Sequence, residues 1–405
     1  MLYFGYQTNA DLLAPLLNAA KLGQASLGWV NGKAEHAMWR RMAASLELVS
    51  RFQLTHERPD YGITRVKAGN QDVAVIEEAA LKTPFGTLLH FRKDMEARGP
   101  KVLVVAPLSG HFATLLRNTV ETLLADHDVY ITDWANARDV PVSAGVFGFD
   151  DYLDHVMDFL RAIGPPAHVV AVCQPCVQTL AAAAIMAERN DPAQPLSMTL
   201  MGGPVDVRVN PTKVNHLANE HSIGWFEKNM ITEVPWRYGG AGRRVYPGFV
   251  QLNAFMQMNM ERHVSAHKTL YEHLANGEID KAETIKKFYD EYFAVLDLTA
   301  EFYLDTVRIV FQEALLAKGE LTYRGAPVRP EKIKRTALLT VEGERDDVCA
   351  LGQTAAAHDL CASLRPYMKK HHMQTSVGHY GLFSGKRWET QIYPIVRNMI
   401  LTLEA

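Results

Sequence analysis

From residue 101 onward, short apolar runs alternate with longer segments in which apolar residues recur at helical spacing. This rhythm predicts buried parallel strands that are covered by helices on both faces. The predicted strands lie at 102–106, 129–133, 168–172, 196–201 and 336–341, and the predicted helices at 112–125, 152–163 and 177–188. Two earlier runs, 72–77 and 87–91, flank a turn signal and predict an antiparallel hairpin at the edge of the sheet.

Two stretches of the chain do not follow this rhythm. Residues 1–70 carry apolar positions at helical spacing, and we expect an N-terminal helical segment outside the sheet. Between 204 and 330, long helical patterns such as 268–276 and 285–318 replace the strands. Because the strands on either side share one pattern, we interpret 204–330 as a helical cap or lid inserted into an α/β core. That core would span 71–203 and 331–405.

The composition narrows the class of protein. Hydrophobic residues make up 48% of the 405 residues and charged residues 21%, which is ordinary for a folded globular enzyme. A net charge of -3 gives no basic excess, so we expect neither nucleic acid nor an anionic membrane as the main partner. The sequence shows no secretory signal pattern and no apolar stretch of spanning length, which predicts a cytoplasmic protein without a transmembrane segment. Four cysteines are too few for a disulfide framework.

A cysteine occupies the turn where a catalytic nucleophile is expected. The predicted strand 168–172 runs into Cys173, Gln174 and Pro175, after which a helix begins. Hydrolases of the α/β type place their nucleophile on such a strand-to-helix turn, usually within G-x-S-x-G. Here Ala171 and Pro175 replace the two glycines; Ala171 is small, and proline suits the first turn of a helix. We therefore predict an α/β-hydrolase fold with Cys173 as nucleophile.

An acid and a histidine follow in the chain order that this fold requires. Asp346 comes after the strand 336–341, and His379 lies between Gly378 and Gly381 on a loop after another strand. His379 would accept the thiol proton, while Asp346 would hold the imidazole in the required tautomer. Asp347 competes for the acid role, but Asp346 has the Gly343-x-x-Asp346 spacing common after this strand.

Two backbone N–H groups are needed to stabilise the tetrahedral oxyanion. We expect the N–H of Gln174 to be one of them. The other would come from the loop after the strand 102–106, from Leu108 or Ser109.

The spacing Cys173-x-x-Cys176 is also that of a thiol–disulfide oxidoreductase, a second class of function. This interpretation leaves His379 and Asp346 unexplained and would require a smaller sheet. Zinc binding by the two cysteines lacks a second pair of Cys or His at structural-site spacing, so we predict no metal and no cofactor.

Over essentially its whole length the sequence resembles the intracellular polyhydroxybutyrate depolymerases, which are relatives of the polyester synthases. The resemblance lies in the N-terminal stretch 1–6, in 104–111, in 130–134, in 172–175, in 201–206, in 341–347 and in 378–381. Polyester synthases usually carry a glycine two residues on either side of the cysteine, so Ala171 and Pro175 favour the depolymerases.

The resemblance implies hydrolysis of the esters of poly(3-hydroxybutyrate) at cytoplasmic granules through an acyl-cysteine, with the triad Cys173, Asp346 and His379. Coenzyme A as acyl acceptor, which would make the reaction thiolytic, and a synthase-like acyltransferase stay open, as does a homo-oligomer. A non-catalytic granule coat would have no use for the triad. Trp134, Trp225 and Phe255 are candidate substrate contacts, although the aromatic stretch 225–260 equally fits the core of the lid.

Overall fold

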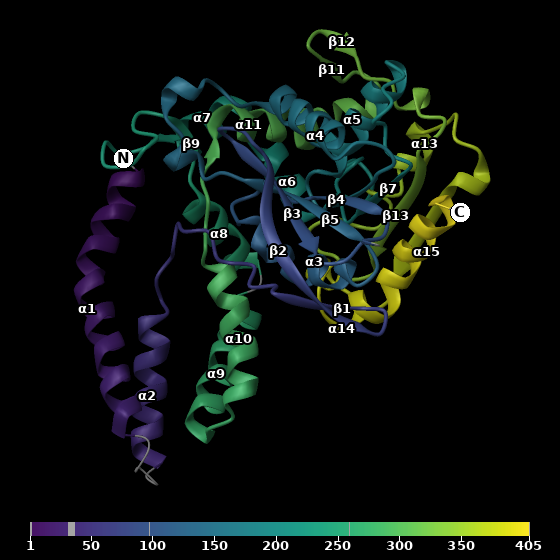
Figure 1. Cartoon of the computed structure of the whole chain (residues 1–405). Coiled ribbons are helices and arrows are strands. Elements are labelled where there is room, and N and C mark those ends of the chain that lie inside the picture. The colour runs from purple at the N-terminus through teal and green to yellow at the C-terminus, as the bar shows by residue number, and fades with distance from the viewer. Residues whose placement is uncertain (1, 31–36, 97, 259, 405) are drawn as a thin grey trace.

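A computed structural model describes residues 2–30, 37–96, 98–258 and 260–404. Within these residues nine strands form one central sheet in the order β1-β2-β3-β5-β4-β6-β7-β13-β14 (Figure 1). Their bounds are β1 Arg65–Ala68, β2 Gln71–Lys82, β3 Gly86–Lys93, β4 Lys101–Val105, β5 Asp128–Trp134, β6 His168–Val172, β7 Ser197–Met201, β13 Ala337–Gly343 and β14 Lys369–Gln374. All pairs from β5 to β14 are parallel, which confirms the predicted α/β class with a mostly parallel sheet.

The first three strands are antiparallel to their neighbours. β2 and β3 form the hairpin that the sequence predicts. In the turn that joins them, the Thr83 hydroxyl donates to the carbonyl of Gly86 and accepts its N–H. The expected edge position was wrong, because β1 pairs with the outer side of β2. Short β1 is the edge strand instead.

Side chains of alternate residues enter two separate cores, because successive residues of a strand point to opposite faces. Leu103 and Val105 of β4 pack in the core that contains α4 Phe149–Ile163 and α5 Cys176–Glu188. Val102 and Val104 pack in the opposite core with α3 Arg117–Leu124 and α15 Tyr393–Glu404. The sheet is thus covered on both faces.

A long helical insertion separates β7 from β13. Its helices are α6 Lys213–Glu220, α7 Ile223–Met230, α8 Gly248–Met258, α9 Met260–Asn276, α10 Ile279–Tyr292, α11 Ala300–Thr306 and α12 Leu315–Lys318. It also contains a small sheet of β8 Thr232–Glu233, β9 Arg244–Tyr246 and β10 Leu298–Thr299.

The helical pattern predicted over 285–318 is not one helix. α10 ends at Tyr292, and the next residues, 293–299, are buried and not helical; Val295 bridges to His111. The apolar run Phe293-Ala294-Val295-Leu296 has the composition of a helix face. In the structure this run is a buried connecting segment. The periodicity of apolar residues does not distinguish such a segment from a buried helix.

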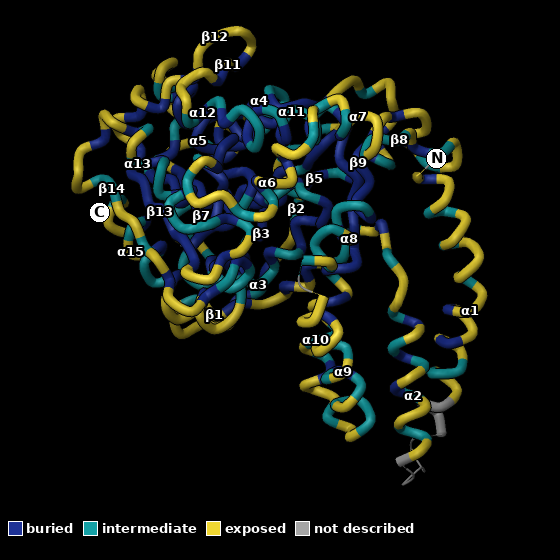
Figure 2. Tube along the Cα trace, turned by 180° about the vertical axis from the view of Figure 1, so that it is seen from behind, coloured by how far each residue is buried: buried dark blue, intermediate teal, exposed yellow. Residues whose placement is uncertain are grey.

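Four helices form an arm that projects from the sheet domain (Figures 1 and 2). α1 Leu2–Val30 packs on α2 Ala37–Ser50, α2 packs on α9, and α9 packs on α10. Among the described residues, no helix is both long and apolar enough to cross a membrane.

The N-terminal end of α1 is tied to the core by a buried carboxylate. The hydroxyl of Tyr3 donates to Asp297 Oδ2 at 2.9 Å, and Gly248 N–H donates to Oδ1 at 2.9 Å. Asn136 Oδ1 accepts the backbone N–H of Asp297. Burial raises the pKa of Asp297 to about 6, while the two donors lower it. This contact joins the arm, the insertion and the loop after β5.

Replacing Tyr3 with phenylalanine should destabilise the protein by about 1–3 kcal/mol, because a buried carboxylate loses a donor. Urea unfolding measures this change, and limited proteolysis of α1 should accelerate. Tyr238→Phe is the control, since the hydroxyl of Tyr238 bonds to Gln7 in a more exposed setting and its loss should cost less. Equal stability of Tyr3→Phe and wild type would show that this bond does not hold α1.

Candidate active site

The three predicted triad residues lie at one edge of the sheet. Cys173 follows β6, Asp346 follows β13, and His379 follows β14. These strands are parallel, so their carboxyl ends meet at the same edge, where α/β sheets bind their ligands. The topology therefore brings together residues that are up to 206 positions apart in sequence.

Cys173 occupies a strained turn between β6 and α5. Its φ is +67°, in the left-handed region that residues with a Cβ seldom adopt. Its N–H donates to Met201 O at 2.8 Å, and its carbonyl accepts the N–H of Cys176 at 3.1 Å. Cys173 is half-buried, whereas the other three cysteines are buried. The turn presents this one thiol at the end of the strand, which is the geometry of a nucleophile elbow.

Two glycines after β7 make room for the elbow. A Cβ on Gly203 would lie 2.2 Å from Cys176 Cβ and 2.7 Å from the carbonyl oxygen of Cys173. A Cβ on Gly202, whose φ is +57°, would lie 2.9 Å from Leu382 Cδ1. Gly203 is therefore required by the close approach to the elbow, and Gly202 by its backbone conformation and its contact with Leu382.

A histidine–carboxylate pair faces the thiol. His379 Nδ1 lies 2.7 Å from Asp346 Oδ2, which leaves Nε2 free to act on the neighbouring Cys173 side chain. Asp346 Oδ1 accepts the backbone N–H groups of Val348 and Cys349, each at 2.9 Å. Both side chains are buried, with Asp346 8% and His379 7% exposed. Asp346, and not exposed Asp347, is the carboxylate that contacts the ring.

The surroundings make His379 a strong base. Burial alone would lower its pKa, but the charge of Asp346, the neighbouring Cys173 and the hydrogen bonds to both raise the pKa well above its usual value. A more basic imidazole takes a thiol proton more readily.

Burial has the opposite effect on the other thiols. It raises the pKa of Cys176 and Cys349 well above the usual value and that of Cys361 to about 12. These three thiols stay protonated and unreactive at neutral pH. Among the four cysteines, only Cys173 is both accessible and beside a base.

Of the predicted oxyanion donors, the N–H of Leu108 already has a hydrogen-bond partner. The side-chain oxygen of Gln174 accepts the N–H of Leu108 at 3.4 Å, while Gln174 Nε2 is buried without a partner. Ser109 follows on the same loop and is half-buried. The long bond to Leu108 is weak and can yield to a stronger acceptor.

A cavity of about 460 Å³ opens beside His379. Phe255 lines it, together with residues that the sequence analysis missed; these include Tyr292, Tyr380, Arg262 and Arg345. Tyr380 could have been found from the sequence, because it follows His379 directly. The other residues lie on α9, on α10 and in a loop, and no sequence pattern marks them as part of the site.

Two of the three predicted substrate contacts do not line this cavity, and their contact with substrate stays a prediction. Trp134 is 2% exposed, packs on Tyr152, and donates its Nε1–H to Ala106 O. Trp225 stacks on His221 with a 3.8 Å centroid distance, away from the cavity lining. Trp134 ends a buried strand and Trp225 lies on α7, and only the tertiary structure places them away from the cavity lining.

Nothing in the described part of the chain gathers three or more His, Cys, Asp or Glu side chains into a metal-binding group.

A mostly parallel sheet with helices on both faces and an elbow after β6 defines an α/β-hydrolase, within which the site fits ester hydrolysis. A family model described as "PHB de-polymerase C-terminus" matches residues 202–404, half of the chain. The protein therefore belongs to the polyhydroxybutyrate (PHB) depolymerase family and is an ester hydrolase. The matched region contains Asp346 and His379, while Cys173 precedes it.

Solved structures match this chain at low sequence identity. An epoxide hydrolase from Bacillus megaterium is 11% identical, with a TM-score of 0.46, over 83% of this chain and 99% of that one. A 2-hydroxy-6-oxo-6-phenylhexa-2,4-dienoate hydrolase from Rhodococcus sp. strain RHA1 is 12% identical, with a TM-score of 0.42, over 81% and 99%. None of the curated proteins matches the sequence.

Gly203→Ala should destabilise the protein by about 2–4 kcal/mol or displace the elbow, because the new methyl group overlaps Cys176 and the backbone of Cys173. Thermal unfolding and esterase activity on a soluble butyrate ester would both fall. Gly224→Ala in α7 is the matched control, since the added Cβ meets only Ser222 Oγ at 3.9 Å. A Gly203→Ala protein with normal stability and activity would contradict the close packing at this turn.

Proposed function

We propose that this protein hydrolyses the ester bonds of poly(3-hydroxybutyrate) through an acyl-cysteine intermediate on Cys173, with His379 as base and Asp346 as its partner. The observation that carries the proposal is the half-buried thiol on a positive-φ turn, beside a histidine whose Nδ1 contacts a buried carboxylate. Membership of the PHB depolymerase family supports the polymer as substrate.

The first half of the reaction forms a thioester. His379 Nε2 takes the proton of Cys173 as Sγ attacks the ester carbonyl carbon, and the negative charge develops on the carbonyl oxygen. The N–H groups of Gln174 and the Leu108–Ser109 loop would stabilise that oxyanion; Leu108 would exchange its weak bond to the Gln174 side chain for the oxyanion. The ester C–O bond then breaks, and His379 returns the proton to the leaving alkoxide.

The second half releases the acid. His379 takes a proton from water as the oxygen attacks the thioester carbonyl, the C–S bond breaks, and Cys173 regains its proton. The product is a carboxylate, and Arg262 and Arg345 line the same cavity, where a guanidinium group can pair with it. The cavity wall is otherwise rich in apolar and aromatic side chains, which suits an uncharged aliphatic chain.

Cys173→Ala should abolish release of 3-hydroxybutyrate from amorphous polymer granules while the protein stays folded. Cys176→Ala is the matched control: this thiol is fully buried and should cost stability rather than activity. Release would be measured with and without coenzyme A, and a requirement for coenzyme A would identify thiolysis. Equal loss in both variants would instead favour a redox pair, and turnover by Cys173→Ala would remove the mechanism.

Asp346→Asn should lower kcat by about 10²–10⁴-fold, because the imidazole loses its orienting carboxylate. The pH dependence should change in a defined direction. Asp346 raises the pKa of His379, and the base must be unprotonated to act. Without this carboxylate the pKa falls, so the acid limb of kcat/KM on a soluble ester moves to lower pH.

Asp347→Asn is the matched control for this profile, since Asp347 is exposed, whereas the buried Asp346 is the carboxylate that contacts the His379 ring. Its acid limb should stay where the wild-type limb lies. An unchanged profile in Asp346→Asn would contradict the assigned pair.

A further inference from the structure

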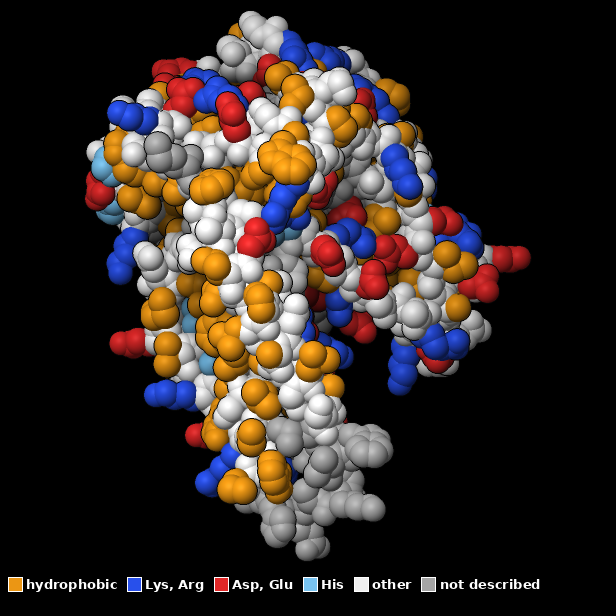
Figure 3. Space-filling model, turned by 90° about the vertical axis from the view of Figure 1, so that its left-hand side faces the viewer, with side chains coloured by type: hydrophobic (Ala, Val, Ile, Leu, Met, Phe, Trp, Pro, Cys, Tyr) orange, Lys and Arg blue, Asp and Glu red, His pale blue; other side chains and the backbone are white. Residues whose placement is uncertain are grey.

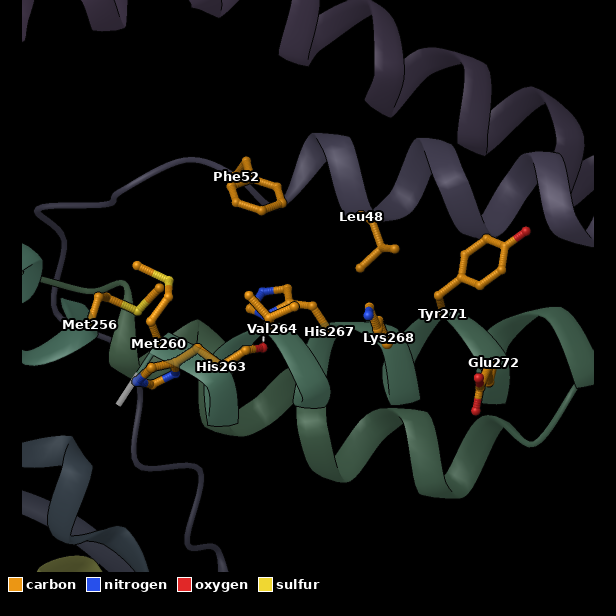
Figure 4. A pocket seen from close by; sticks show the side chains of 10 residues that line it. All are labelled: Leu48, Phe52, Met256, Met260, His263, Val264, His267, Lys268, Tyr271 and Glu272. Atoms are coloured by element: carbon orange, nitrogen blue, oxygen red, sulfur yellow. Dashed lines mark hydrogen bonds between the residues drawn. The ribbon is translucent and has the colours of Figure 1, made fainter. Parts of the chain in front are cut away.

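An apolar groove of about 470 Å³ lies between α2 and α9, outside the cavity beside His379 (Figure 4). This volume is in the range of small-ligand sites. Leu48 lies on α2 and Phe52 lies two residues beyond its end; both face Met260 and Val264 of α9 (Figure 4). Phe52 is 65% exposed, Val264 47% and Met260 46%. Such a cluster of large exposed apolar side chains marks a binding surface.

A few polar groups accompany the apolar walls. Lys268, Tyr271 and Glu272 line one end of the groove on α9 (Figure 4). The ammonium and phenol groups are hydrogen-bond donors. An aliphatic ester offers a carbonyl acceptor for every few methylene or methyl groups, so a long apolar wall with sparse donors matches it chemically.

An aromatic path connects the groove with the candidate catalytic histidine. The steps between ring centroids are 5.6 Å from Phe52 to His267, 4.2 Å to Tyr289, 6.2 Å to Tyr292, 6.4 Å to Tyr380 and 5.9 Å to His379. His263 lines both the groove and the cavity beside His379. The two spaces are thus neighbours on either side of one helix.

We propose that the groove between α2 and α9 binds a segment of an uncharged aliphatic polyester at a distance from the ester that is cleaved. This inference rests on the proposed function and adds a second polymer-binding site to it.

The composition of α1 favours an apolar, uncharged partner over an anionic bilayer. Exposed apolar side chains follow α1, among them Phe4, Leu12 and Leu22. On the face that Figure 3 shows, hydrophobic and uncharged atoms cover much of the arm, while charged side chains gather mainly on the sheet domain. Helices that lie on anionic membranes carry many Lys and Arg, whereas the helix segment Leu2–Val30 contains a single lysine, Lys21, and no arginine.

The test measures binding without turnover. Cys173→Ala protein is sedimented with amorphous poly(3-hydroxybutyrate) granules, alone and with Phe52→Glu and Val264→Glu added. We expect the two charges to weaken granule binding at least about tenfold, because a carboxylate in an apolar groove loses its hydration. Val142→Glu, also at an exposed apolar residue but on the sheet domain, is the matched control and should bind like the background.

A second measurement separates the groove from the catalytic centre. In the wild-type background, Phe52→Glu with Val264→Glu should lower the ratio of polymer to soluble butyrate-ester kcat/KM by about tenfold, while circular dichroism reports an intact fold. Unchanged granule binding and an unchanged ratio would overturn the proposal. A dimer that dissociates on these substitutions while granule binding stays constant would assign the groove to a second copy and overturn it as well.

The two proposals fail separately. Granules bound through the groove but not cleaved by wild type would remove the depolymerase function and leave the groove as a polyester site.

Discussion

The left-handed turn at Cys173 is the constraint on which the rest of the site depends. A residue with a Cβ at φ +67° persists only where its surroundings hold it. Here the N–H of Cys173 is held by Met201 at the end of the neighbouring strand, and Gly203 packs against Cys176 and the backbone of Cys173. The strain is thus supported by a sheet that is buried on both faces. Its consequence is an accessible thiol at the end of β6.

The carboxyl edge of the sheet also brings the histidine and its carboxylate together. His379 and Asp346 follow neighbouring parallel strands, so their side chains meet without any need for proximity in sequence. Asp346 is fixed by two backbone N–H donors, and its charge outweighs the effect of burial on the histidine. The buried thiols have the reverse electrostatics, since their hydrogen bonds do not offset the lost hydration. The surroundings alone therefore make Cys173 the reactive thiol and leave the other three cysteines unreactive.

The insertion and the N-terminal helices form the walls of the cavity and of the groove, which the sheet does not provide. α9 and α10 form one wall of the cavity beside His379, and α9 with α2 encloses the groove on the other side. Asp297, fully buried, binds Tyr3 and Gly248 and so couples α1 to the insertion. The arm is therefore attached to the domain that carries the triad, and its apolar surface has a fixed relation to the catalytic edge.

The sequence by itself determined the α/β class, the hairpin of β2 and β3, and three triad candidates in the right chain order. These depend on local periodicity and on motifs that neighbouring residues define. Only the tertiary structure decided that Asp346 contacts His379, that Leu108 is partly engaged by Gln174, and that Trp134 is core. The end of α10 within 285–318 could not be predicted from the sequence either, because a fully buried segment and a helix face have the same apolar residues. Burial and contact arise from the packing of distant segments, which local pattern does not encode.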